Sequence, residues 1–350
     1  MEKMTARLCE LLVSLLLIAF VNSCSSYYYV ETCVDNDLSV IRSVYTESSD
    51  RGSSALGFVS DGLWEISDVD EAFPVDFYDE IKLMRIKSVA DADDIASLRY
   101  HPDSENEYNP VFRPVETLSK RFRWFYTYYE YKAVFASIKD ELPLPFDSYM
   151  TDEQLELFFK GDNPPAGWNG IEMYCLLDDV NQNFARWYSD GAYQVLCEVL
   201  EPYCDDFQFD MLVDSKERFM KTVQPEALFG MDPYEFTAKL EEVLPHAGFS
   251  GILKDNSTSI EDDYEKKTGI LEYFSYSFMY SLRLPGEYID GNAVDFMDGN
   301  AVWKADAFRL MYDDLVMEAV SRKLNLWAFF ITFISIAVLL QVFAKIFSVR

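Results

Sequence analysis

The sequence contains only 2 histidines, which leaves little room for imidazole-based catalysis or zinc sites. Of its 2 histidines, His246 precedes residues 248–251, Gly-Phe-Ser-Gly, which are the closest approach to a serine nucleophile beside a base. That segment lacks the spacing of a nucleophile elbow, and a loop after a helix explains it equally well. His101 precedes Pro102 in a polar stretch, where we expect a surface loop. We therefore predict no catalytic residue.

Adjacent acidic side chains are the second group that could do chemistry, because paired carboxylates act in acid–base hydrolysis and bind calcium. They occur at residues 91–94, 205–206 and 261–263, whereas residues 68–71 lack the glycine and closing glutamate of an EF-hand loop. Among 60 acidic residues such pairs are expected by chance, so we interpret them as solvated faces. Phosphate-loop, dinucleotide and H-E-x-x-H motifs are absent from the sequence. No metal site and no cofactor is predicted.

The composition argues against two broad classes of protein. The 350 residues are 49% apolar and 16% aromatic, which is too apolar for a disordered chain. With 60 acidic and 30 basic residues the formal net charge is -30. Nucleic-acid binding needs clustered lysine and arginine, so no nucleic-acid partner is expected.

The N-terminus has the pattern of an export signal. A basic start is followed by a mostly apolar run over residues 8–21 and then by Ser23, a small residue that suits the position before a cleavage, which predicts a signal peptide over residues 1–23. Cys24 follows the small residue, as in a bacterial lipoprotein signal, where the cysteine becomes the first mature residue and carries acyl chains. We therefore predict lipidation at Cys24, with an ordinary cleavage and a plain thiol as the alternative.

The C-terminus predicts a transmembrane helix over residues 326–347. Residues 326–343 carry no charge, and a helix of this length can cross a hydrocarbon core of about 30 Å. Arg322 and Lys323 precede the run, and Trp327 occupies the position of an interfacial aromatic residue. The export signal then orients the chain, with its bulk on the periplasmic side of a bacterial cell envelope and its tail in the cytosol.

Strand patterns occupy both ends of the exported part. Residues 27–34 and 38–45 are β-branched and aromatic, and Asp35-Asn36-Asp37 between them predicts a hairpin turn. Residues 121–135 carry rings on both faces, so we expect a strand that is covered on both sides. Further strands are predicted over 270–282 and 315–322, with a turn at Pro285-Gly286. The repeated Asp-Gly-Asn-Ala-Val at residues 290–294 and 298–302 predicts two tight hairpin turns.

The middle of the chain has helical periodicity from about residue 151 to 245. Capping patterns begin at Thr151, Asn169 and Asp232, each ahead of apolar residues spaced three and four apart. The cysteines at 33, 175, 197 and 204 contain no C-x-x-C motif, and we expect mostly free, buried thiols.

These patterns together predict an α+β fold: a membrane-proximal β-rich domain with a helical insertion, plus one C-terminal transmembrane helix. The β-rich domain would comprise residues 24–145 and 266–325, and the insertion residues 146–265. Two separate β domains are the alternative.

The chain also resembles known bacterial proteins. The signal ending at Cys24, the basic-aromatic run over residues 119–129 and the closing span look like uncharacterised Bacteroidota membrane-anchored lipoproteins. The turn at residues 284–286, followed by Asn-Ala-Val-Trp-Lys at 300–304, is similar to a β-domain of LppM-type lipoproteins, over about residues 270–345. These resemblances imply a location and a fold but no chemistry.

The leading hypothesis is a non-enzymatic envelope protein. Its exported domain would be tethered to the membrane by the helix and by N-terminal acyl chains, and would bind or organise another envelope component. The alternatives are a membrane-bound hydrolase that uses a carboxylate pair, and a carrier of an apolar ligand.

Overall fold

The computed structural model describes residues 26–46, 65–67, 85–90, 114–160, 165–223, 231–245, 247–272, 274 and 276–348. They form two compact units. The described parts of Met1–Phe135, Tyr276–Ala305 and Leu315–Arg350 make the β unit, and those of Ala136–Ser275 and Asp306–Asp314 make the helical unit. The prediction of mixed helix and sheet structure is therefore confirmed.

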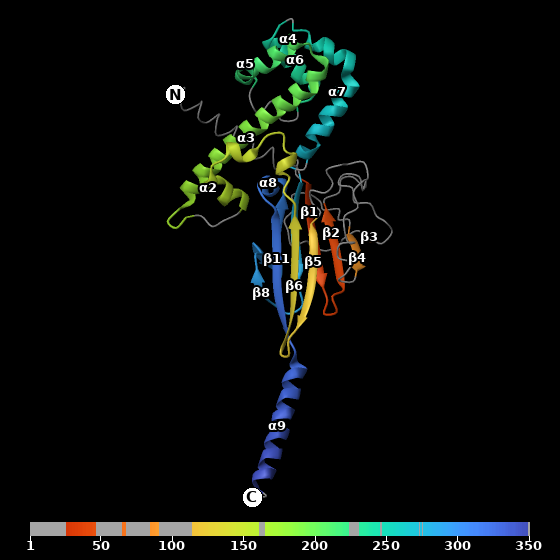
Figure 1. The fold of residues 1–350 in the computed structure, drawn as a ribbon, viewed down its shortest axis with the longest axis vertical. Coiled ribbons are helices and arrows are strands. Elements are labelled where there is room, and N and C mark those ends of the chain that lie inside the picture. Colours follow the sequence, from red (N-terminus) through yellow and green to blue (C-terminus); the bar gives the residue numbers. More distant parts are fainter. Residues whose placement is uncertain are drawn as a thin grey trace. The chain divides into compact units, whose positions relative to one another are not determined.

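The β unit contains two sheets (Figure 1). The seven-stranded sheet has the order β3 (Glu65–Ser67), β4 (Arg85–Ala90), β2 (Val40–Thr46), β1 (Ser26–Val34), β7 (Tyr276–Arg283), β10 (Asn300–Asp306), β9 (Asp295–Met297). The four-stranded sheet has the order β5 (Val115–Phe122), β6 (Tyr126–Phe135), β11 (Leu315–Leu324), β8 (Glu287–Gly291). β1 and β7 pair in parallel, far apart in sequence, whereas β6 and β11 pair antiparallel over the whole length of both strands. Segments from both ends of the chain therefore complete both sheets.

The predicted hairpin at residues 35–37 is confirmed by antiparallel pairing of β1 with β2. The side chain of Asp37 accepts hydrogen bonds from the backbone and hydroxyl of Ser39, at 3.1 and 2.7 Å, which is the local bonding expected of an aspartate in a turn. The prediction for residues 315–322 is also confirmed, by β11.

The turn predicted at Pro285-Gly286 is present, and it carries the chain from β7 in one sheet to β8 in the other. Gly286 has a φ of +93°, and a Cβ atom there would collide with the backbone carbonyl of Arg322 on β11. Glycine is therefore required both by the backbone conformation and by the close approach of the neighbouring strand.

The two copies of the Asp-Gly-Asn repeat adopt different structures. At Asp298 and Gly299, φ values of 51° and 83° form the predicted two-residue hairpin turn between β9 and β10. The hairpin predicted at the first copy is wrong, because β8 and β9 belong to different sheets. Asn292 secures this crossing: it exchanges backbone and side-chain hydrogen bonds with Glu318 and accepts one from the indole of Trp303.

The single strand expected over residues 121–135 is a hairpin instead. β5 ends at Phe122, and β6 starts at Tyr126 and pairs back along β5. The prediction that both faces are covered is wrong as well. Tyr129 and Tyr131 are buried on the inner face, whereas Tyr126 and Tyr128 on the outer face remain half-exposed.

The helical unit contains seven of the described α-helices. They are α2 (Asp152–Gln154), α3 (Gly170–Leu200), α4 (Asp206–Asp214), α5 (Lys216–Thr222), α6 (Pro233–Val243), α7 (Phe249–Glu272) and α8 (Ala307–Leu310). The capping boxes predicted at Thr151 and Asn169 are present, and Asp232 caps α6. Residues Leu155–Lys160 continue α2 as a π-helix.

Helix α7 was not expected from the sequence. Its first turn contains residues 249–251, where a loop was predicted, and its last turn contains residues 270–272, where a strand was predicted. The helix is kinked at Asn256, whose φ and ψ are -132° and 21°. Asn256 lies in a polar run of poor helix formers, so the local propensity is weak and packing of the apolar face maintains the helix.

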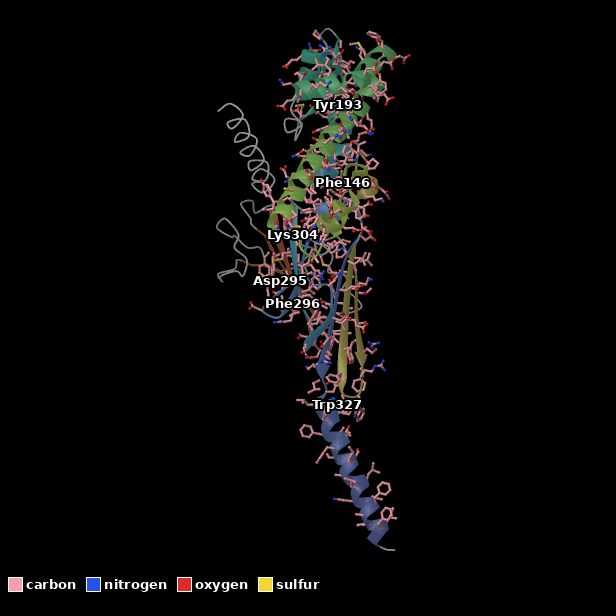
Figure 2. All side chains as sticks on the ribbon, turned by 90° about the vertical axis from the view of Figure 1, so that its left-hand side faces the viewer. Phe146, Tyr193, Asp295, Phe296, Lys304 and Trp327 are labelled. Carbon is pink, nitrogen blue, oxygen red and sulfur yellow. The ribbon has the colours of Figure 1, made fainter. Side chains whose placement is uncertain are left out.

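Aromatic side chains dominate the core of the helical unit. Tyr193 on α3 packs against Phe219 and Phe236, with ring centroids 5.3 and 5.4 Å apart. A second cluster surrounds Phe146, whose ring centroid lies 5.4 Å from that of Trp187. Figure 2 labels Tyr193 and Phe146, one in each cluster. Helix α3 thus contributes Tyr193 to one group of packed rings and Trp187 to the other.

One helix among the described residues is long and apolar enough to cross a membrane. It is α9 (Leu326–Ser348), and its candidate span covers Leu326–Phe347. Nearly all of this segment is exposed in the structure, unlike the core helix of a soluble protein. The predicted C-terminal apolar helix is therefore confirmed as a candidate membrane span.

Candidate functional site

The tip of the β5–β6 hairpin packs against the beginning of α9. Phe122 stacks on Trp327 with ring centroids 6.1 Å apart, and Trp124 meets the same indole edge-on at 5.4 Å. Phe125 lies 4.6 Å from Phe329. Figure 2 labels Trp327 where α9 leaves the strands. Aromatic packing, and not the chain connection alone, therefore fixes the direction of α9.

Asn325, the single residue between β11 and α9, locks the same junction with hydrogen bonds. Its backbone N–H donates to Phe125 O at 2.9 Å, and its Nδ2 donates to Arg123 O at 2.9 Å. Its Oδ1 accepts from Thr127 Oγ1 at 3.0 Å. These bonds satisfy carbonyl groups of the hairpin turn that would otherwise lack partners.

One further hydrogen bond extends along α9. The indole Nε1 of Trp124 donates to Thr332 Oγ1 at 2.8 Å. Thr332 is six residues beyond Leu326, so this contact lies about 9 Å along the helix axis. The hairpin tip thus overlaps the first two turns of the apolar helix, where the indole N–H of Trp124 and the hydroxyl of Thr332 are paired with each other.

The outer face of the four-stranded sheet carries arginines stacked on tyrosines beside this tip. The guanidinium of Arg121 lies 5.6 Å from the ring centroid of Tyr128, and that of Arg322 lies 5.2 Å from Tyr126. Tyr128 pairs with Arg121 on one side and Arg322 on the other, which places both cations at the same level of the sheet. Cation–π contacts hold the arginines against the sheet while leaving their edges exposed.

The inner side of the same level carries two lysines that converge on the β1–β2 turn. Lys120 Nζ donates to Asn36 O, and Lys323 Nζ donates to Asn36 Oδ1, both at 2.5 Å. The hydroxyl of Tyr129 also donates to Asn36 O, at 3.3 Å. The lysines therefore join the two sheets at the end nearest α9.

We call the residues around the hairpin tip and the start of α9, on both faces of the sheet, the hairpin collar. Its members are five cations and three aromatic residues: Lys120, Arg121, Arg123, Arg322, Lys323, Phe122, Trp124 and Trp327. Cations and aromatic residues next to an apolar helix are typical of a membrane–water interface. In a chain of net charge -30, such a basic group stands out against an acidic background.

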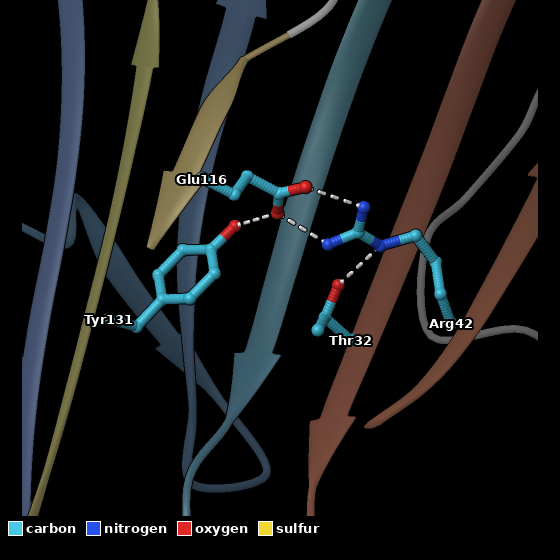
Figure 3. A network of polar contacts seen from close by, with 4 residues as sticks. All are labelled: Thr32, Arg42, Glu116 and Tyr131. Atoms are coloured by element: carbon cyan, nitrogen blue, oxygen red, sulfur yellow. Dashed lines mark hydrogen bonds and ion pairs between the residues drawn. The ribbon is translucent and has the colours of Figure 1, made fainter. Parts of the chain in front are cut away.

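A buried ion pair joins the two sheets further inside the β unit (Figure 3). Arg42 on β2 donates from Nη1 to Glu116 Oε2 at 2.8 Å and from Nη2 to Oε1, while its Nε donates to Thr32 Oγ1 at 3.0 Å. The hydroxyl of Tyr131 donates to Glu116 Oε1. The side chains of Arg42 and Glu116 are only 2% and 3% exposed. Because each charge has its countercharge and further hydrogen bonds, the group is a structural link between the sheets.

Ionisable groups are also perturbed inside the helical unit. Burial raises the pKa of the Cys197 thiol to about 12 and of the Cys204 thiol to about 11. Burial and a hydrogen bond to Asp190 raise the pKa of Tyr149 to about 12. All three groups stay protonated at neutral pH, which is the behaviour of packed groups and not of nucleophiles.

The described cysteines are free, as predicted, but the expectation that most are buried is wrong. Cys197 is buried, Cys33 and Cys204 are half-buried, and Cys175 is exposed. The half-exposed face of α3 accounts for Cys175, because the apolar period of that helix continues beyond its packed part.

Most of the residues considered for lipidation or for chemistry lie where the structure gives no description. Cys24, His101, His246 and the acidic run at residues 91–94 lie outside the described residues. Asp205 is the N-cap of α4, and residues 262–263 are exposed on α7. No cluster of His, Cys, Asp or Glu in the described ranges is arranged to hold a metal ion.

The sequence does not predict the collar, although it shows each half of it as a separate pattern. The run at residues 119–129 and the flank at 322–327 are distant in the chain, and only the pairing of β6 with β11 unites them. Comparison with known proteins gives no further assignment: no family model, curated protein or solved structure matches the chain.

Proposed function

We propose that this chain is a membrane-anchored envelope protein without enzymatic activity, whose helical unit binds another component of the envelope. Residues 1–23 would be a signal peptide, Cys24 a lipidation site, and the bulk of the chain would lie on the periplasmic side. In this proposal the chain belongs with the Bacteroidota lipoproteins and LppM-type β-domains that its sequence resembles.

The packing of the hairpin tip on α9 carries the anchoring part of the proposal. Trp124 and Phe125 contact Thr332 and Phe329, which lie inside the apolar segment. A span that is clamped in this way holds the β unit at the membrane surface, whereas a flexible linker would let it move away. Such a fixed junction suits a protein that presents a domain at a defined distance from the bilayer.

The orientation depends on the N-terminal signal. Arg322 and Lys323 before the span are balanced by Lys345 and Arg350 after it, so the charges of the two flanks do not set the orientation. In the proposal a cleaved export signal sets it, because large domains are translocated largely regardless of charge.

An exposed apolar stripe on α3 supports the binding part of the proposal. Ile171 and Tyr174 are 72% and 61% exposed, and Leu177 follows one turn later. Residues at this spacing share one helix face, and contiguous exposed apolar residues mark interaction sites.

Glu116, a buried carboxylate of the β unit, is paired with Arg42, and the two sheets also pack through Phe135 and Tyr280, whose ring centroids lie 5.2 Å apart. These contacts favour neither a hydrolase that uses a carboxylate pair nor a carrier of an apolar ligand.

The orientation is tested by labelling Cys175, which is exposed on α3. A membrane-impermeant maleimide is expected to label it in spheroplasts without lysis, and Cys175→Ser should abolish the labelling. Labelling of Cys175 only after lysis would contradict the periplasmic placement.

The binding part is tested by crosslinking in membranes. A partner captured by the native chain should be lost with Ile171→Ser/Tyr174→Ser and retained with Val294→Ser, a control at a residue 60% exposed in the β unit. Capture that is unaffected by the stripe variant, or no specific partner at all, would contradict this part.

A further inference from the structure

We propose that the outward-facing arginines of the hairpin collar, Arg121, Arg123 and Arg322, bind the phosphate groups of anionic phospholipids in the leaflet where α9 begins. This inference rests on the proposed membrane anchoring and adds the class of lipid that the anchor selects.

The three arginines lie close to the level at which α9 begins. Trp124 reaches Thr332, about 9 Å into the apolar helix, so the hairpin tip enters the interface with α9. Arg123 directly precedes Trp124, and Arg322 lies two residues before the end of β11, about 7 Å from it. The polar headgroup layer is about 5–8 Å thick on each side of the bilayer. The three cations therefore lie at the depth of lipid phosphates when α9 spans the membrane.

The arginines use few of their hydrogen-bond donors within the described residues. Arg121 contacts Glu130 through one N–O pair at 2.9 Å, and Arg322 contacts Glu287 through one at 3.4 Å. A guanidinium carries five N–H donors in a planar fork, which matches the oxygens of a phosphate. The side chain of Arg123 makes no hydrogen bond or ion pair to any residue that the structure describes. Most N–H donors of the three arginines are therefore available to a ligand.

The collar has an excess of positive charge. The collar contains five cations, and the carboxylates paired with them in the described residues are Glu130 and Glu287; Asp37 lies near Lys120. The acidic remainder of the chain is repelled by an anionic membrane surface, so a basic collar at the level of the span has an opposite preference. Lys120 and Lys323 are turned toward Asn36, which leaves the arginines as the outward-facing cations.

The test uses the tryptophans of the collar as reporters. The full chain is reconstituted in phosphatidylcholine vesicles that contain a minor fraction of phosphatidylglycerol, and either lipid is supplied in brominated form, which quenches tryptophan at short range. Of the 6 tryptophans, Trp124 and Trp327 lie at the collar. We expect quenching per brominated lipid to be about fivefold stronger for the anionic lipid, the factor that corresponds to one basic residue near an anionic surface.

The decisive variant is Arg121→Gln/Arg123→Gln/Arg322→Gln. It should quench equally with both lipids, whereas the charge-matched control Arg186→Gln/Lys221→Gln/Lys239→Gln, on exposed positions of the helical unit, should keep the preference. Equal quenching of the native chain by both lipids, or a preference that survives in the collar variant, overturns the proposal.

Two further readouts keep the outcome unambiguous. If the triple variant does not reconstitute, Arg123→Gln alone should reduce the preference, since its side chain has no role in the described packing; an unchanged preference overturns the proposal. Absence of quenching by either brominated lipid would show that α9 is not in the bilayer, which contradicts the proposed anchoring and is distinguishable from loss of selectivity.

Discussion

Replacing Glu116 by Gln tests whether the buried ion pair holds the two sheets together. The change preserves the shape of the side chain but leaves the charge of Arg42 without its countercharge. Two unit charges about 4 Å apart attract each other by about 4 kcal/mol at an effective dielectric constant of 20. Both side chains are nearly completely buried, so water cannot replace the lost partner. We expect the β unit to lose about 3–5 kcal/mol of unfolding free energy.

Hydrogen exchange measured by mass spectrometry on the full chain in detergent gives this quantity for each unit separately. A loss of about 3 kcal/mol makes amide exchange in β2 and β5 more than about 100-fold faster, because about 1.4 kcal/mol corresponds to a factor of ten. Peptides from α3 provide an internal reference and should not change. Tyr131→Phe removes one hydrogen bond to the carboxylate, and we expect it to cost less, about 1.5–3 kcal/mol.

The matched control is Glu130→Gln on the outer face of the same hairpin. Glu130 is 41% exposed and pairs with Arg121 at 2.9 Å, so its loss should cost less than about 1 kcal/mol. If Glu116→Gln changes exchange in β2 and β5 no more than Glu130→Gln does, the reasoning from burial is refuted.

Three other predictions concern backbone strain and titration. Gly286→Ala should lower the free energy of unfolding by about 3 kcal/mol or more, because a Cβ atom would strike the Arg322 carbonyl. Gly299→Ala, with open space around it, should lower it by only about 1–2 kcal/mol, measured by thermal unfolding. Similar losses in the two variants would contradict the close approach at Gly286. Cys175 should react with iodoacetamide at mildly alkaline pH while Cys197 does not, since burial raises the pKa of the Cys197 thiol to about 12; equal rates of the two thiols would refute this. The same pKa shift means that above pH 9 the folded helical unit keeps a proton on Cys197 that the unfolded chain releases. The stabilisation that this thiol contributes is therefore full below pH 9 and should be lost as pH rises from 9 toward 12. Denaturant titrations should show a smaller decline for Cys197→Ala, and identical pH profiles for the two chains would count against this reasoning.

Local patterns of the sequence predicted the elements that local chemistry determines. The capping boxes at Thr151 and Asn169, the turn at residues 35–37 and the apolar helix α9 all depend on neighbouring residues and are present in the structure. The boundary between helix α7 and strand β7 was predicted wrongly, because the apolar residues there fit both a strand and the packed face of a helix. Residues 270–272 precede the apolar strand β7 without a glycine or proline between them, so they were assigned to the strand, although they complete the packed face of α7.

Contacts between distant residues were not predictable in this way. The two copies of Asp-Gly-Asn are identical in sequence, yet one forms a hairpin and the other crosses between sheets, because Asn292 meets Glu318 on a strand that only the fold brings near. Arg42 and Glu116 lie 74 residues apart, and the pair carries no local pattern. The segment Asp306–Asp314 joins the helical unit partly through the hydrogen bond from Ile138 N to Leu310 O, again between distant residues.

The parts of the collar were predictable from local sequence, but their contact with each other was not. Trp327 was recognised as an interfacial aromatic residue and residues 119–129 as a basic-aromatic run, but their contact depends on the register of β6 against β11, in which Tyr126 lies opposite Leu324. Only this pairing brings the hairpin tip to the first turn of α9.

The proposed anchoring of the chain by α9 is tested most directly by extracting isolated membranes with alkaline carbonate, which releases peripheral proteins and leaves spanning ones in the pellet. The full chain should remain in the pellet and enter the supernatant only when detergent dissolves the bilayer. Release of the intact chain by carbonate alone would show that α9 does not span the membrane, and the account of the collar as an interface would be wrong.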